Sequence, residues 1–342
     1  MLQTANHTPF ATGLALFPDE EGIDTVYPII KASFSVSDTI ALAEKQQPLK
    51  YADEYNGEPG ASSIKYAAEA CPLKPATDVV LIGNAYSPNQ HPCAEVDVTL
   101  RIGAKEKAVR VFGDRKWKNG AFGVVATKPE EFTEMPLLYE RAYGGMDTTK
   151  SGQEVGCDFN TAGRGYFHPK SERDAVGTLL PNLEDPRDPI KRYTSNPKPA
   201  CFAPVSPNWH PRLPYAGTYD ERWQKTRAPY LPSDFDLRFF SVAPADLIFS
   251  PYLEGGETIE ITNATRSGQL RFHLPRIRFD VTLRIAGKSE KTQVYLETVL
   301  IEPDANLLSM VWKGKRRCDK QLLKMELATF DIAQSDKHVK GL

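Results

Sequence analysis

Short runs of alternating apolar and polar residues, each ended by turn residues, constrain this chain more than any other feature. Such period-two alternation is typical of β-strands that bury one face. Val26–Val36 opens with β-branched residues and settles into this pattern, and residues 78–85 form a short apolar run stopped by turn residues. Val96–Ile102 leads through a glycine-containing turn into Ala108–Gly113, which predicts a hairpin. The first third of the chain is therefore expected to form β-structure.

Strand patterns return in the last third of the chain. They cover Glu257–Thr262, Gln269–Leu274, Gln293–Ile301 and Leu307–Trp312. One hexapeptide, Asp97–Ile102, recurs as Asp280–Ile285, and both copies lead through a turn into another strand. A duplicated β unit stays one interpretation of this echo and coincidence the other, because alternating residues readily match. Few helices are expected, and the better candidates, both short, are Pro129–Tyr139 and Arg316–Met325.

The middle of the chain differs in character, because prolines, glycines and aromatic residues crowd together with little periodicity from about residue 129 to residue 245. A chain of 342 residues is long enough for one large or two ordinary domains. The sequence therefore predicts a mainly β fold with few short helices. Two packed antiparallel β units of the sandwich or open-barrel type, residues 1–128 and 246–342, would be joined by the long irregular segment 129–245.

Charge and cysteine content restrict the partners and the compartment. The formal net charge is −2, and the one dense basic cluster, Lys313 with residues 315–317, is short, so we expect no nucleic-acid partner. The first residues lack the pattern of a secretory signal, and no apolar stretch is long enough for a membrane span. The five cysteines show no CxxC spacing and are odd in number, which fits free thiols. We expect a cytoplasmic protein without a membrane partner.

Motifs that usually carry enzyme chemistry are missing from the sequence. There is no GxxxxGK[ST], GxGxxG, GxSxG or HExxH, and the histidines and cysteines do not have metal-ligand spacing. We therefore assign no catalytic residue, no cofactor site and no metal site. Arginines and carboxylates do cluster in the central segment, where they could serve acid–base chemistry. The favoured interpretation is structural, since long loops need side-chain partners for their backbone groups.

The second half of the central segment is the predicted contact surface for a partner protein. Prolines alternate there with aromatic residues and arginines, the residue types that dominate protein–protein hot spots. The candidate partner-binding residues are Trp209, Arg212, Tyr219, Trp223, Tyr230 and Phe235.

Eight short segments, spread in order over nearly the whole chain, resemble one bacterial protein family. They are Leu73–Val79, Val111–Trp117, Tyr139–Gly145, Gly163–Gly165, Leu180–Glu184, Ala216–Asp220, Leu231–Asp236 and Leu253–Glu257. On these segments the chain resembles the domain-of-unknown-function 2169 family, whose members are found beside type VI secretion spike genes and look like effector adaptors.

The resemblance implies a non-enzymatic cytoplasmic adaptor or chaperone that holds one cognate toxic effector and helps to load it onto the type VI secretion spike. Its expected partners are that effector and the spike (VgrG-type) protein, with no cofactor. Two alternatives stay open. One is a hydrolase-like enzyme with a carboxylate site in the central loops, drawn from Asp220, Glu221, Asp234 and Asp236, which a deep pocket of strongly perturbed carboxylates would favour. The other is a structural spike-associated component.

Overall fold

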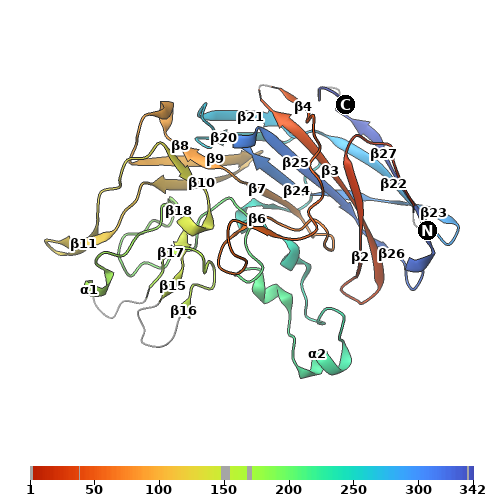
Figure 1. Cartoon of the computed structure of the whole chain (residues 1–342), viewed down its shortest axis with the longest axis horizontal. Coiled ribbons are helices and arrows are strands. Elements are labelled where there is room, and N and C mark those ends of the chain that lie inside the picture. Colours follow the sequence, from red (N-terminus) through yellow and green to blue (C-terminus); the bar gives the residue numbers. More distant parts are fainter. Residues whose placement is uncertain (1–2, 38, 148–154, 168–171, 337–338) are drawn as a thin grey trace.

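Strands dominate the computed structural model of the chain, which describes residues 3–37, 39–147, 155–167, 172–336 and 339–342 (Figure 1). The mainly β fold predicted from the alternation is confirmed. The longest strand, β3, spans Asp24–Val36, where the sequence predicted a strand over Val26–Val36. The predicted hairpin is present as β9 (Glu95–Ile102) and β10 (Lys105–Phe112), joined by a two-residue turn.

Three larger sheets make up the body of the molecule. The eight-stranded sheet contains β19 (Ile248–Phe249), β7 (Thr77–Leu81), β24 (Val294–Glu302), β25 (Leu307–Gly314), β3 and β2 (Ala11–Pro18) in this order, with β26 (Arg316–Arg317) and β4 (Ile40–Leu42) also paired to β3. The five-stranded sheet has the order β18 (Leu183–Glu184), β10, β9, β20 (Thr258–Thr262) and β21 (Gln269–His273). The four-stranded sheet has the order β1 (Gln3–Asn6), β27 (Met325–Ser335), β22 (Ile277–Ile285) and β23 (Lys288–Thr292).

Smaller elements decorate this body. Two-stranded pairs are formed by β5 (Glu54–Tyr55) with β6 (Ile64–Tyr66), β8 (Asn84–Tyr86) with β13 (Glu134–Pro136), β11 (Trp117–Gly120) with β12 (Gly123–Ala126), β14 (Tyr143–Gly144) with β17 (Arg164–Gly165), and β15 (Met146–Asp147) with β16 (Val155–Gly156). The α-helices are α1 (Glu172–Ala175) and α2 (Glu221–Thr226); short 3₁₀ turns are η1 (Pro88–Gln90), η2 (Tyr139–Arg141), η3 (Leu213–Ala216), η4 (Leu237–Phe240), η5 (Ala245–Leu247), η6 (Pro303–Ala305) and η7 (Leu322–Lys324). No helix in the described part of the chain is both long and apolar enough to span a membrane.

The two β units expected at residues 1–128 and 246–342 share their sheets. Strand β24 lies between β7, to which it is parallel, and β25, and β25 in turn pairs with β3. In the five-stranded sheet, β20 adds antiparallel to β9. The β7–β24, β3–β25 and β9–β20 pairings each join a strand from the first third of the chain to one from the last third, so the separation at those boundaries does not describe the sheets.

Both predicted helices are wrong. In Pro129–Tyr139, residues 134–136 pair with β8 instead, and Phe132 forms a β-bridge with Cys93. In Arg316–Met325, the first two residues pair with β3, and the chain then turns through positive φ at Asp319 and Lys320. Tertiary strand pairing overrides the weak local preference for a helix in both segments.

The repeated hexapeptide occupies equivalent local positions. Asp97–Ile102 lies in β9 and Asp280–Ile285 in β22, and each strand continues through a two-residue turn into an antiparallel neighbour. The turns contain residues with positive φ, among them Gly103 at 55° and Ala286 at 50°, which tight hairpins of this length require. The echo therefore marks the start of two hairpins, which lie in different sheets.

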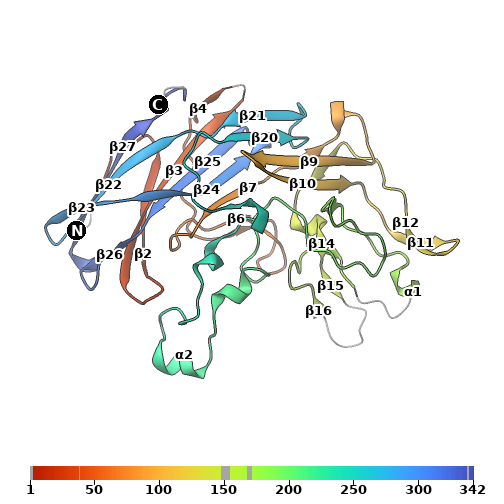
Figure 2. The ribbon, with the colours of Figure 1, turned by 180° about the vertical axis from the view of Figure 1, so that it is seen from behind.

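One apolar core joins the layers. Phe10, just before β2, makes edge-to-face contacts with Phe34 of β3 and Phe279 of β22, at ring-centroid distances of 6.2 and 5.9 Å. Phe279 also meets Trp312 of β25 at 5.1 Å. These contacts place the four-stranded sheet against one face of the eight-stranded sheet. Figures 1 and 2 show the two layers side by side, with the loop-rich lobe around β14–β17 at the opposite end of the molecule.

Candidate functional site

An arm, residues 213–240, leaves the body of the molecule and returns to it (Figures 1 and 2, around α2). It begins with η3, carries α2 near its tip and ends with η4. At its base, Phe235, Phe239 and Phe240 form a mutual aromatic cluster with centroid distances near 5.5 Å. The Asp236 N–H donates to the Tyr215 carbonyl at 3.0 Å, which closes the two halves of the arm on each other.

Carboxylates hold the arm in one conformation. Asp220 caps α2 by accepting a hydrogen bond from the Trp223 N–H at 2.8 Å. Asp234 accepts from the N–H and the hydroxyl of Thr218, and these bonds lower the pKa of its carboxyl. Asp236 accepts from the Arg238 guanidinium and N–H, which likewise lower its pKa. These acids, nominated above for a hydrolase, thus serve as caps and ties on a projecting surface.

The tip of the arm rests on the turn between β2 and β3. The Arg227 guanidinium donates to the Glu20 carbonyl, and the ring of Tyr230 lies over Gly22, where an added Cβ would be 3.2 Å from the ring. Trp223 donates from its indole N–H to the Tyr230 carbonyl at 2.8 Å and packs edge-to-face against Tyr219. Aromatic area nevertheless stays in solvent, since Tyr219 is 54% and Tyr230 43% exposed.

The six predicted partner-binding residues divide into two groups. Tyr219, Trp223 and Tyr230 lie on the outer part of the arm, and Phe235 is half-buried at its base. The other two, Trp209 and Arg212, lie in the interior and not on the predicted contact surface.

Trp209 is 1% exposed; its indole donates to the Thr161 hydroxyl at 2.9 Å, and its ring meets Tyr139 edge-to-face. Arg212 is 6% exposed and donates to the carbonyls of Val205 and Phe239. Neither side chain is accessible to a partner. Aromatic and arginine content alone could not separate them from the exposed residues, because buried loops without strand pairing need the same residue types to satisfy their carbonyls.

The arginines and acids of the central segment also satisfy the backbone of its loops. Asn160 is fully buried and donates to the carbonyls of Tyr139 and Tyr143 at 2.7 and 3.1 Å. Glu140 accepts from the N–H and hydroxyl of Ser63, which ties this lobe to a distant segment.

A second group lies beside it. Asn182 donates to the Phe112 carbonyl and to Asp114, whose carboxylate also faces Arg141 at 3.3 Å and Arg164 at 3.7 Å. Segments that carry the family resemblance therefore meet in space and hold one another's loops in place.

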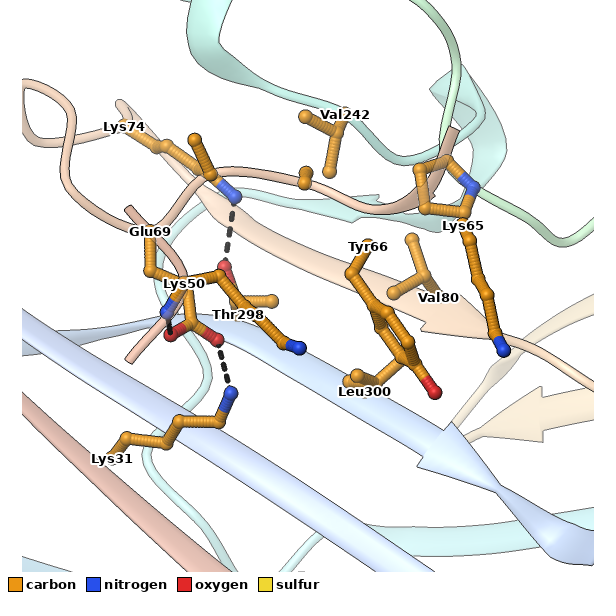
Figure 3. A pocket seen from close by; sticks show the side chains of 13 residues that line it. Lys31, Lys50, Lys65, Tyr66, Glu69, Lys74, Val80, Val242, Thr298 and Leu300 are labelled. Atoms are coloured by element: carbon orange, nitrogen blue, oxygen red, sulfur yellow. Dashed lines mark hydrogen bonds and ion pairs between the residues drawn. The ribbon is translucent and has the colours of Figure 1, made fainter. Parts of the chain in front are cut away.

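A buried ionic network, which was not predicted from the sequence, lies under the loop that precedes β7 (Figure 3). Lys31 pairs with Glu69 at 2.6 Å around a cavity of about 30 Å³, which is room for a water molecule. Lys74 also lines this cavity and pairs with Asp78 at 3.0 Å. Burial alone would lower the pKa of Lys74, but the carboxylates of Asp78 and Glu297 outweigh it and raise that pKa.

The network continues between β24 and β25. Lys313 pairs with Glu297 at 2.7 Å, with both side chains at most 1% exposed, and its ammonium group also lies 3.3 Å from the Cys71 sulfur. Burial raises the pKa of the Cys71 thiol. Lys74, Thr77 and Asp78 all lie in the resembling segment Leu73–Val79, and Thr77 both donates to the Leu296 carbonyl and accepts from the Leu253 N–H. This segment therefore fastens β7 and β24 together.

Acids neutralise the rest of the basic cluster near the C-terminus. Lys315 pairs with Glu20 at 2.8 Å, and Arg317 pairs with Asp19 at 2.5 Å and with Glu21 at 2.9 Å. The remaining arginine of the cluster pairs with a glutamate of β23. These contacts fix the β2–β3 turn, on which the arm rests. Across the described ranges, no cluster of three or more His, Cys, Asp or Glu residues has the geometry to hold a metal ion.

Together these features define a mainly β protein with one projecting aromatic arm. The chain belongs to the bacterial family described as "Uncharacterized protein conserved in bacteria (DUF2169)", whose family model matches residues 21–313. The match includes the arm and the buried ionic network. None of the curated proteins and none of the solved structures compared with the chain matches it.

Proposed function

We propose that this protein is a non-enzymatic cytoplasmic adaptor, or chaperone, that binds a cognate toxic effector and helps to load it onto the type VI secretion spike. The link to type VI secretion comes from the resemblance described above. The observation that carries a binding role is the arm, which exposes Tyr219 and Tyr230 at its outer end while its backbone is fixed by hydrogen bonds.

The arm suits a docking role for two physical reasons. Tyrosine and tryptophan side chains contribute large contact areas and are enriched among hot-spot residues. A surface that is already ordered loses little conformational entropy when it binds, so more of the contact energy appears as affinity. Asp220, Asp234 and the contact of Arg227 with the β2–β3 turn provide that order.

The direct test is to co-express the chain with the toxin and the VgrG-type spike protein encoded beside its gene, and to analyse the purified material by size-exclusion chromatography and mass spectrometry. We expect a stable complex that contains the effector. If no complex forms with either partner while all three proteins are soluble, the adaptor function is refuted.

A matched pair of variants then tests the arm itself. Tyr219→Ala removes an exposed aromatic residue from the arm, and Phe122→Ala removes one that is fully exposed at the turn between β11 and β12, at the far side of the molecule (Figure 1). We expect Tyr219→Ala to weaken effector or spike binding at least tenfold, Phe122→Ala to leave both unchanged, and both variants to melt like the parent chain. Unchanged binding by Tyr219→Ala and by Tyr230→Ala would refute a docking role for the arm.

A further inference from the structure

Strand β2 is an unprotected sheet edge. It pairs with β3 from Ala11 opposite Lys31 to Pro18 opposite Asp24, and no other described residue pairs with its outer side. Its eight residues, ATGLALFP, carry no charge. Natural edge strands usually carry charges, above all lysine, that prevent pairing with a second chain.

The other long edges of this fold follow that rule. Strand β23, the edge of the four-stranded sheet, contains Lys288, Glu290 and Lys291. Strand β21, the edge of the five-stranded sheet, contains Arg271. Among the edge strands of five or more residues in these three sheets, β2 alone therefore lacks a charge in the described part of the chain, which suggests that its edge is covered when the protein is in its working state.

The ladder of β3 shows which backbone groups of β2 are available. The N–H and carbonyl of Ser33 bind the side chain of Gln46, on the side of β3 away from β25. Backbone groups alternate in direction along a strand, so the backbone groups of the odd-numbered residues of β3 point toward β2. The residues opposite them, which are Ala11, Gly13, Ala15 and Phe17, point their backbone groups toward β3. Thr12, Leu14 and Leu16 consequently direct their N–H and carbonyl groups outward.

We propose that the occupant of this edge is the β2 strand of a second copy of the chain, paired antiparallel about a two-fold axis through Leu14. In this register Leu14 faces its own copy and Thr12 faces Leu16 of the other copy, so every outward N–H and carbonyl of these three residues gains a partner. Moving the two-fold axis by one residue along the strand, in either direction, leaves some of these outward N–H and carbonyl groups unpaired or places them opposite Pro18, which has no N–H.

Side-chain sizes agree with the same axis. On one face of the paired strands, Phe17 faces Ala11 of the second copy and Ala15 faces Gly13, so the largest side chain of β2 meets a small one. Apolar side chains that are now in solvent lie along this edge: Leu16 is 43% and Phe17 38% exposed. Tyr51, 67% exposed, also stands beside Gly13. The pairing covers apolar surface and brings no like charges together.

The dimer also has a geometric consequence. Each β2 strand ends at the turn that supports the arm of its own copy. Antiparallel pairing places the two turns, and therefore the two arms, at opposite ends of the paired strands. The dimer does not depend on the adaptor function, and it can be measured on the purified chain alone.

Light scattering coupled to size-exclusion chromatography on the full chain is the first measurement. We expect the parent chain to have twice the mass of a monomer in the micromolar range. Leu16→Lys places a lysine on the edge, and Thr12→Glu places a glutamate there; each is expected to weaken the dimer at least tenfold while the melting temperature stays close to that of the parent. A parent chain that stays monomeric at the highest soluble concentration overturns the proposal.

The double variant Thr12→Glu/Leu16→Lys tests the register. In the proposed pairing the introduced glutamate of one copy faces the introduced lysine of the other, so dimerisation should recover to within about threefold of the parent. A double variant that remains as weak as the single variants overturns the two-fold register.

Crosslinking gives an independent readout. Leu14→Cys should form an intermolecular disulfide under mild oxidation, whereas the more exposed Leu16→Cys should not, because its copy lies several residues away along the partner strand. The reverse result, or equal crosslinking of both variants above the level of the parent chain with its native cysteines, contradicts an axis through Leu14.

Discussion

Replacing Lys313 by methionine removes the cation of a fully buried ion pair and leaves Glu297 without its direct ion-pair partner. The two groups lie 2.7 Å apart between β25 and β24, with exposed fractions of 0 and 1%. Methionine has nearly the volume of lysine, so the change tests charge rather than packing. We expect Lys313→Met to be among the most damaging single substitutions in the chain.

The magnitude follows from the burial of both groups. A buried carboxylate that has lost its direct partner must either remain charged or take up a proton, and the removal of one member of a buried pair typically costs about 3–5 kcal/mol. Most domains have a free energy of unfolding of about 5–15 kcal/mol. The double variant Lys313→Met/Glu297→Gln removes both charges and keeps a carbonyl oxygen for the Lys74 N–H, which now donates to Glu297. We expect it to cost only about 1–2 kcal/mol.

Urea unfolding followed by the fluorescence of the four tryptophans measures these differences. Lys291→Met serves as the control, because Lys291 pairs with Asp280 at 3.0 Å on the surface, with side chains 73 and 46% exposed. That substitution should cost less than about 1 kcal/mol. The reasoning is refuted if Lys313→Met costs no more than Lys291→Met, or if the double variant is as unstable as Lys313→Met alone.

Three further substitutions probe other parts of the structure. Burial alone would raise the pKa of Asp19, but hydrogen bonds from two backbone N–H groups and from a guanidinium outweigh it and lower that pKa, so the stabilising contribution of Asp19 is present above pH ~4 and is lost as the pH falls through the folded-state pKa. The difference in unfolding free energy between the parent and Asp19→Asn should therefore shrink in acid, and a constant difference from pH 7 to pH 3 would contradict this. Gly144→Ala places a Cβ about 2.2 Å from the Asn160 carbonyl oxygen at a φ of 150°, so we expect the free energy of unfolding, measured with urea, to fall by at least about 3 kcal/mol. A fall of under about 1 kcal/mol would show that the loop adapts. Trp209→Ala should cost about 3–5 kcal/mol, seen as a large drop in melting temperature, whereas an unchanged melt would argue against its burial.

Local pattern predicted the strands well. The alternation at Val26–Val36, the hairpin that follows Val96 and the run at Leu307–Trp312 all correspond to strands with similar bounds, because each of these segments buries one or both faces in a way that its own residues record. Which strands pair with one another could not be predicted from the sequence. The parallel pair β7–β24 joins segments more than 200 residues apart, and a single sequence holds no signal for such a register.

The candidate site was predicted only in part. Tyr219, Trp223 and Tyr230 do lie on a projecting surface, but composition could not show that Trp209 and Arg212 turn inward. The buried ion pairs were missed for a related reason. A lysine such as Lys313, within a cluster of basic residues, looks like part of a solvated surface until strand pairing brings a glutamate from the neighbouring strand next to it.

The position of β3 in the sheet has a consequence for how the protein folds during its synthesis on the ribosome. This strand is held by β2 on one side and by β25 on the other, and about 270 residues separate its end from the start of β25. At a synthesis rate of about 5–20 residues per second, the inner side of β3 waits roughly 15–55 seconds for its neighbour. Strand β7 waits in the same way for β24. The nascent chain therefore carries two open strand edges until its last seventh begins to emerge, and its final assembly takes place after most of the chain has been made.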